Sequence, residues 1–237
     1  MPIPTIYPDL NRILSSSDSP KITTITTKDS LIDSHAYFLT SFFIYYNLKN
    51  ESQNQENKIV ILKSFRLRKF EIAAILTKSG LNVSKLESDK LLKIYGIDSE
   101  NFENLKDFLD TNQYTTETNN ENAQSPNQIL LLDGLTSILE EENYKNSDKL
   151  IRILINLEAR YSKIIYKTEI NENCKVEIKL QKYLKARSGL KIECLPTSFV
   201  STSVHGKLVV ENEEEEVYQR LYFVKDRVLK LNAVGLS

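Results

Sequence analysis

The sequence predicts an α/β fold with a mainly parallel central sheet, helices on both of its faces, and an antiparallel hairpin extension at the C-terminus. Two continuous apolar runs, KIVILK (58–63) and QILLLDGL (128–135), have the composition of strands buried on both faces. Segments with helical spacing lie between such runs, and this alternation is typical of parallel sheets. From residue 189 onward, short apolar runs separated by turn-forming and charged residues predict antiparallel strands over 189–237. We expect all 237 residues to form a single domain.

The N-terminal third predicts a strand, a helix, a second strand and a second helix. The stretch ITTIT (22–26) is β-branched throughout, as strands often are. In the following stretch, 31–49, five apolar residues recur at helical spacing: Ile32, Ala36, Leu39, Phe43 and Tyr46. After the KIVILK strand, residues 65–81 predict a second helix that ends near Gly80, a residue favoured at helix C-termini.

The middle of the chain predicts a short strand, a helix and a long polar loop. The stretch LLKIYG (91–96) is the strand, and SENFENLKDFLD (99–110) is a helix capped by Ser99. Residues 111–128 are polar and lack periodicity, so we expect a disordered loop there.

Three more segments complete the predicted α/β body. Residues 148–162 form an amphipathic helix whose apolar stripe is wide enough to be buried against two surfaces. The stretch KIIYKTEI (163–170) follows as a strand, and residues 176–187 form an amphipathic segment rich in lysine.

The first strand–turn–helix unit stands where an open α/β protein often binds phosphate. A phosphate-binding loop needs glycines that let backbone N–H groups approach the ligand, together with a lysine. The stretch TTKDSLIDS (26–34) supplies Lys28 and none of the glycines, so we expect a plain strand-to-helix connection. Asp133 ends a buried strand, where such folds often hold a magnesium ligand; without a phosphate loop, a structural role is favoured. The sequence thus predicts no catalytic residue, no metal site and no cofactor.

Cysteine content and hydropathy bear on the compartment. Cys174 and Cys194 have no metal-ligand spacing and suggest reduced thiols inside the cell. No secretory signal is visible, and no stretch approaches the roughly 18–20 apolar residues of a membrane-spanning helix. We expect a soluble protein of the cytoplasm and the nucleus that does not bind membranes.

Two basic clusters are the candidates for contact with phosphate groups. The net charge of −1 predicts no strongly basic nucleic-acid binder, so any such contact must come from a local patch. The simpler explanation of either cluster is a solvent-exposed helix face. The more specific alternative is contact with an RNA backbone. The RNA-contact candidates are Arg66, Arg68 and Lys69 in one cluster, and Lys182, Lys185 and Arg187 in the other.

Several stretches together resemble the family of the sixth subunit of the Elongator complex. Near the start, YPDLNRIL resembles the opening segment of that family. The stretches DSHAYFLTSFFIYYNLK and KIVILKSFRLRKFEIAAILTKSGLNV are similar to its first helix, second strand and Ser-Phe junction. ILLLDGLTSIL resembles its central strand, with Asp133 in the matching place, and SFVSTSVHGKLVVE resembles its C-terminal region.

This resemblance implies a RecA-like fold and a role in a protein ring. Members of the family lack the usual ATPase motifs and alternate with subunits four and five in a hetero-hexameric accessory ring. That ring binds tRNA and assists the catalytic Elongator subunits in modifying the wobble uridine. The resemblance therefore implies a non-catalytic ring subunit whose partners are the fourth and fifth Elongator subunits, the catalytic subunits and tRNA.

Three alternatives stay open, and one of them is a scaffold with no role in RNA binding. The fifth Elongator subunit is a structural cousin of the sixth, although the C-terminal pattern fits the sixth better. The chain is otherwise interpreted as a degenerate ATPase of the RecA or recombinase type that acts on DNA. Nucleotide binding by the isolated chain distinguishes that enzyme from a ring subunit.

Overall fold

The structure is a computed structural model, and it describes nine stretches of the chain. These are residues 20–28, 30–49, 58–99, 125–139, 147–169, 174–197, 205–212, 217–225 and 228–233. The predicted helix beyond residue 99, the polar segment 111–124 and the N-terminal YPDLNRIL stretch lie outside the described residues. In the described part of the chain, no helix is long and apolar enough to cross a membrane.

In the described stretches, nine strands form one sheet in the order β3-β2-β4-β5-β1-β6-β7-β8-β9. The first six in this order are parallel, and β7, β8 and β9 extend the sheet as an antiparallel meander. The strands are β1 (Ile22–Thr27), β2 (Ile59–Ser64), β3 (Leu92–Tyr95), β4 (Ser125–Asp133), β5 (Tyr161–Glu169), β6 (Leu190–Leu195), β7 (Gly206–Glu211), β8 (Val217–Lys225) and β9 (Val228–Ala233).

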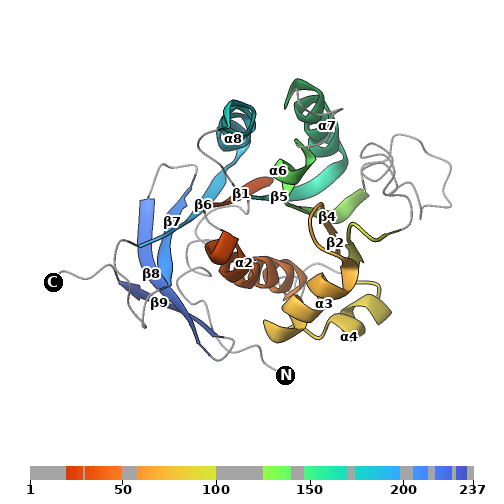
Figure 1. The fold of residues 1–237 in the computed structure, drawn as a ribbon. Helices are drawn as coiled ribbons and strands as arrows, with labels where there is room; N and C mark the ends of the chain where they lie inside the picture. The colour runs from red at the N-terminus through yellow and green to blue at the C-terminus, as the bar shows by residue number, and fades with distance from the viewer. Residues whose placement is uncertain are drawn as a thin grey trace.

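Helices cover both faces of the parallel part of the sheet (Figure 1). One face carries α2 (Ser30–Lys49), α3 (Lys69–Lys78) and α4 (Val83–Ser88), and the other carries α6 (Leu135–Ile138), α7 (Ser147–Arg160) and α8 (Lys175–Arg187). The antiparallel strands lie beside α2 (Figure 1), and Leu208, Val210 and Tyr222 pack into the same core as this helix.

Each face of the sheet has its own hydrophobic core, because successive side chains of a strand point to opposite faces. On β4, Leu131 packs into the core under α2 and α3, whereas Leu130 and Leu132 pack under α6 and α7. All three side chains are fully buried. This two-sided burial explains why β4 appears in the sequence as a continuous apolar run.

The predicted fold class is confirmed: the sheet is mainly parallel, helices flank it, and antiparallel strands end the chain. Two predicted boundaries are wrong. Residues 125–128, expected at the end of the disordered loop, belong to β4, which pairs with β5 there through Ser125 and Tyr161. Strand β6, expected within the antiparallel region that starts at 189, pairs in parallel with β1.

Candidate functional site

The carboxyl ends of three neighbouring strands bring a serine, an aspartate and a lysine together. In the sheet register, Asp133 at the end of β4 lies opposite Ser64 of β2 on one side and Lys167 of β5 on the other. Tyr37 reaches this point from α2, and Arg66 reaches it from the segment that follows β2. We call these five residues the Asp133 cluster.

Asp133 is the acceptor at the centre of the cluster. Its Oδ2 accepts hydrogen bonds from the hydroxyl groups of Tyr37 (2.6 Å) and Ser64 (2.7 Å). The ammonium group of Lys167 lies 2.9 Å from Oδ1, and the guanidinium of Arg66 donates to both oxygens at 3.2 Å. Both carboxylate oxygens are therefore occupied by donors from the chain itself.

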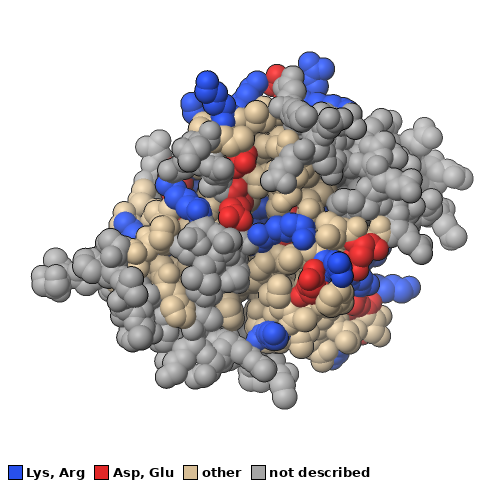
Figure 2. Space-filling view, viewed as in Figure 1, with Lys and Arg blue, Asp and Glu red and all other residues tan. Residues whose placement is uncertain are grey.

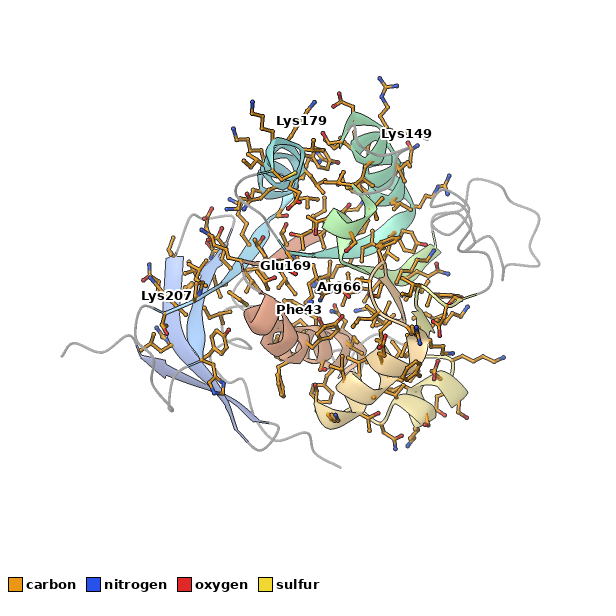
Figure 3. The ribbon with its side chains drawn as sticks, viewed as in Figure 1. Phe43, Arg66, Lys149, Glu169, Lys179 and Lys207 are labelled. Carbon is orange, nitrogen blue, oxygen red and sulfur yellow. The ribbon has the colours of Figure 1, made fainter. Side chains whose placement is uncertain are left out.

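The positive charges of the cluster also lie against an aromatic ring. The Lys167 ammonium is 4.1 Å from the centroid of the Tyr37 ring, and the Arg66 guanidinium carbon is 5.6 Å from it. Asp133 and Lys167 are fully buried, whereas the Arg66 side chain is 21% exposed. Arg66 also lies 3.7 Å from Glu169, and these two residues meet in the centre of the molecule above α2 (Figure 3).

The charge of the Asp133 carboxylate is stabilised by these neighbours. Burial alone would raise the pKa of Asp133, because it removes water from the charged form. The charges of Lys167 and Arg66 and the hydrogen bonds from Tyr37 and Lys167 outweigh burial and hold the pKa well below its usual range. Asp133 is thus an ionised carboxylate neutralised by two internal cations.

These residues do not fit a magnesium–nucleotide site. A magnesium ion requires oxygen ligands in an octahedron, but Lys167 already donates to Oδ1 of Asp133 and Arg66 donates to both of its oxygens. The connection that would cradle phosphates is also short, since β1 ends at Thr27 and α2 begins at Ser30. In the described residues, no group of three His, Cys, Asp or Glu side chains is arranged to hold a metal ion.

The first predicted RNA-contact cluster is divided by the fold. Arg66 points inward to Asp133, whereas Arg68 and Lys69 are exposed where α3 begins. The backbone N–H of Arg68 donates to Glu71, and the Lys69 ammonium lies 2.9 Å from Glu87. Of the three, Arg68 and Lys69 stay at the surface, and Arg66 is a structural partner of Asp133.

The second predicted cluster is divided in a similar way. Lys182 is exposed, whereas Lys185 forms an ion pair with Glu193 of β6. Arg187 donates two hydrogen bonds, at 3.1 and 2.9 Å, to one oxygen of the buried Glu158 of α7. The Arg187 side chain is still 54% exposed. Lys185 and Arg187 therefore also anchor the C-terminal half of α8 to its neighbours.

Two phenols complete the environment of Glu158. The hydroxyl groups of Tyr183 (2.9 Å) and Tyr166 (3.2 Å) donate to the carboxylate oxygen that Arg187 does not contact. Burial, followed by contact with Glu158, raises the pKa of both phenols, so they remain protonated donors at neutral pH. This arrangement connects α7, β5 and α8, which is consistent with a structural role.

Sequence reasoning singled out Asp133 and Arg66 but missed their partners Tyr37, Ser64 and Lys167. A signal for Lys167 was present, because Lys163 and Lys167 flank the apolar run 164–166 of a predicted strand. A lysine inside a buried strand needs a negative counter-charge, and Asp133 is an acidic residue at the end of another buried strand. Tyr37 had no such signal, because an aromatic residue on an apolar helix face is ordinary.

Gly96 keeps the entrance to α3 close to the end of β3. A Cβ atom at this position would lie 2.3 Å from the backbone nitrogen of Lys69 and 2.6 Å from backbone atoms of Leu67 and Arg68. We expect Gly96→Ala to lower the free energy of unfolding by about 1–3 kcal/mol, because the backbone must move to relieve the overlap.

Chemical denaturation would measure this change. The comparison variant is Gly80→Ala, where a Cβ atom meets nothing within 4 Å and only the left-handed backbone (φ +98°) is strained. A Gly96→Ala protein as stable as the Gly80→Ala protein would contradict the close packing of this turn.

Comparison with known proteins identifies the fold. No protein-family model matches the sequence, and no curated protein matches it. The structure is similar to that of a KaiC-like protein from the hyperthermophilic archaeon Pyrococcus horikoshii, with a TM-score of 0.59 over 89% of this chain and 88% of that chain. Sequence identity is 10%, so the likeness concerns the fold alone. The chain has a RecA-like fold of the type seen in this KaiC-like protein.

Proposed function

We propose that this chain is a non-catalytic, RecA-like subunit of the hetero-hexameric Elongator accessory ring. Its partners there are the fourth and fifth subunits, and the ring supports tRNA binding and wobble-uridine modification by the catalytic subunits. The specific part of this proposal comes from the sequence resemblance, which runs from the N-terminal segment to the C-terminal strands. The non-catalytic part comes from the geometry of the sheet edge.

The observation that carries the proposal is the internal neutralisation of Asp133. In open α/β sheets, ligands bind at the carboxyl ends of the strands, which is where the Asp133 cluster lies. A magnesium ion bound to the Oδ1 carboxylate oxygen of Asp133 would compete with the ammonium group of Lys167, which is fully buried and lies 2.9 Å from that oxygen. The chain keeps a RecA-like fold, but Lys167 and Arg66 neutralise Asp133 at the sheet edge where ligands usually bind. This combination fits a protein whose fold serves assembly with other subunits.

Apolar residues at two separate places on the surface support a ring interface. Phe70 (62% exposed) and Ile97 (39% exposed) lie near edge strand β3, and Val217 (54% exposed) lies on β8, next to the opposite edge strand. A heterologous ring contact joins two different surfaces of neighbouring subunits, so it requires complementary patches at two places. Exposed aromatic residues are also enriched at the centres of protein interfaces.

The alternative is a degenerate RecA-type or recombinase-type ATPase that acts on DNA. The KaiC-like structural neighbour makes this the second candidate, because the fold is shared. The two functions differ in what the isolated chain binds. We expect no saturable binding of ATP with magnesium in calorimetric titration, whereas the ATPase alternative requires it.

Native mass spectrometry of the chain co-expressed with the fourth and fifth Elongator subunits tests the ring proposal. We expect a complex with equal numbers of all three subunits, and we expect Phe70→Asp to weaken its assembly. Ile155→Asp is the matched control, because Ile155 is an exposed apolar residue (48%) on α7, a different part of the surface. A monomer, or an oligomer of this chain alone, would overturn the proposal.

A further inference from the structure

The outer surface of α7 and α8 carries a concentration of positive charge. Helix α8 contains five lysine and arginine residues and one glutamate, a net charge of +4, while the whole chain carries −1. Helix α7 adds three basic and two acidic residues. In the space-filling view, blue side chains gather over these two helices, at the top of the molecule (Figure 2).

The spacing of the α8 lysines places three of them on one side of the helix. Lys175, Lys179 and Lys182 are exposed and follow the i, i+4, i+7 pattern of a single helix face. Leu180 and Leu184 of the same helix are buried in the core under α8. The three lysines therefore project away from the sheet, over a length of about 10 Å.

Helix α7 supplies a second row beside the first. The two helices pack together, and Lys179 of α8 forms a 2.6 Å ion pair with Asp148 of α7. Lys149 and Lys179 both point outward at the top of their helices (Figure 3), and Arg152 is exposed one turn further along α7. We call Lys149, Arg152, Lys175, Lys179 and Lys182 the basic helix face.

Most of this charge is not neutralised by the protein. Among the residues that the structure describes, Arg152, Lys175 and Lys182 form no ion pair with a carboxylate. The pair between Lys179 and Asp148 is more than half exposed on both sides, and such pairs are weak and screened by salt. By contrast, Lys185 and Arg187 are held by Glu193 and Glu158. The available cations therefore lie on the outward side of α7 and α8.

We propose that the basic helix face binds the phosphate backbone of RNA. The choice of RNA rests on the proposed function, while the choice of a phosphate backbone rests on the charge and spacing of the face itself. Two rows of cations on packed helices, about 8–10 Å apart, present several ammonium and guanidinium groups to one strand. Such contacts give electrostatic binding without sequence specificity.

The composition of the face favours a nucleic acid over a protein partner. Protein interfaces are depleted in lysine and have an apolar centre, whereas nucleic-acid interfaces are strongly positive. Ile155 is the one large apolar residue that is exposed on the described part of these two helices. An acidic protein remains an outcome of the test below.

The test compares two triple variants of the full chain. Lys175→Gln, Lys179→Gln and Lys182→Gln together remove the α8 row. The matched control, Lys78→Gln, Lys85→Gln and Lys90→Gln, removes three exposed lysines near α3 and α4 and changes the net charge equally. Fluorescence anisotropy with a labelled single-stranded RNA of about 20 nucleotides, at salt concentrations from about 50 to about 200 mM, gives the salt dependence of binding.

We expect the slope of log affinity against log salt to become shallower by about 2 in the α8 variant, because three fewer cations release counterions from a single strand. The control variant should keep the slope of the unmodified chain. No RNA binding by the unmodified chain at about 50 mM salt, or an equal change in both variants, would overturn the proposal. Poly-glutamate binding as tightly as RNA would overturn the assignment to nucleic acid.

The outcome is separable from that of the ring proposal. Native mass spectrometry of the α8 variant with the fourth and fifth subunits reports assembly independently of RNA. If the α8 variant assembles normally and the salt dependence of its RNA affinity is unchanged, the RNA-binding role of the basic helix face is rejected and the ring proposal stands. If the salt dependence of RNA affinity becomes shallower but no complex forms with the fourth and fifth subunits, the basic helix face binds RNA and the Elongator assignment is rejected.

Discussion

Replacing Asp133 with asparagine is expected to lower the free energy of unfolding by about 3–5 kcal/mol at neutral pH. The substitution keeps the shape of the side chain but removes its charge. Lys167, which is fully buried 2.9 Å from Asp133, would then carry a positive charge in the core without its carboxylate partner. Chemical denaturation of the two proteins measures the difference directly.

A double variant separates the loss of the pair from other effects. Asp133→Leu combined with Lys167→Met removes both charges, and we expect it to regain most of the lost stability, because apolar residues often replace buried ion pairs at little cost. Asp148→Asn is the surface control: its partner Lys179 is 56% exposed, so we expect a change within about 0.5 kcal/mol. Equal losses for Asp133→Asn and Asp148→Asn would contradict the role assigned to the cluster.

The same cluster predicts a loss of stability in acid. The folded pKa of Asp133 is depressed below the ordinary value of 3.8, so the folded state binds a proton at this carboxylate less readily than the unfolded state does. The stabilisation is therefore fully present above about pH 5 and is lost as the pH falls through 4 and below. We expect the Asp133→Asn protein to show a smaller stability change between pH 6 and pH 3 than the unmodified protein.

Replacing Lys163 with methionine is expected to raise the free energy of unfolding by about 3 kcal/mol at pH 7. Lys163 lies on β5 with 6% of its surface exposed, near the ring of Tyr46 on α2. Burial, with a smaller contribution from the charge of Lys58, lowers its pKa from 10.5 to about 8. The folded state therefore carries a penalty for the charged lysine that methionine does not have.

The stability advantage of Lys163→Met is expected to depend on pH. Below pH 8 both the folded and the unfolded states are protonated, and the penalty is fully present. Between pH 8 and 10.5 the folded lysine is neutral while the unfolded one is still charged, so stability rises with pH. The advantage of Lys163→Met should consequently shrink towards zero as the pH approaches 10.5.

Lys163→Arg is the matched control for this effect. Arginine keeps its charge throughout this pH range, so the variant should gain no stability at pH 7 and should lack the rise above pH 8. Denaturation curves at intervals between pH 7 and 10.5 would measure all three proteins. An advantage of Lys163→Met that stays constant with pH would show that packing, and not the charge, is responsible.

Local sequence patterns predicted most of the fold correctly. The β-branched run at 22–26 and the apolar runs at 58–63 and 128–135 became central strands, because residues with these side chains gain most from burial in a sheet. The errors lie where local composition and long-range pairing disagree. Residues 125–128 are polar like the loop before them, but pairing of β4 with β2 and β5 extends the strand through them.

Less of the candidate site could be predicted. Asp133 was recognisable because it ends a buried strand, and Arg66 because it follows the carboxyl end of another. The sequence could not show that Arg66 belongs with Asp133 while Arg68 and Lys69, two and three residues later, lie at the surface. The direction in which each side chain leaves the strand end depends on where α3 begins, and packing against the neighbouring strands determines that.

The positions of the central strands β1, β2 and β4, their two-sided burial and the absence of glycines after β1 could be predicted from the sequence, since each depends on residues close together in the chain. The folded structure was needed to show that Lys167 and Arg66 neutralise Asp133, that Arg187 binds Glu158, and that Lys175 and Lys182 of α8 are exposed beside α7. These contacts join residues between 29 and 67 positions apart. Charge pairing in a protein interior depends on distance and burial, and only the folded chain sets both of them.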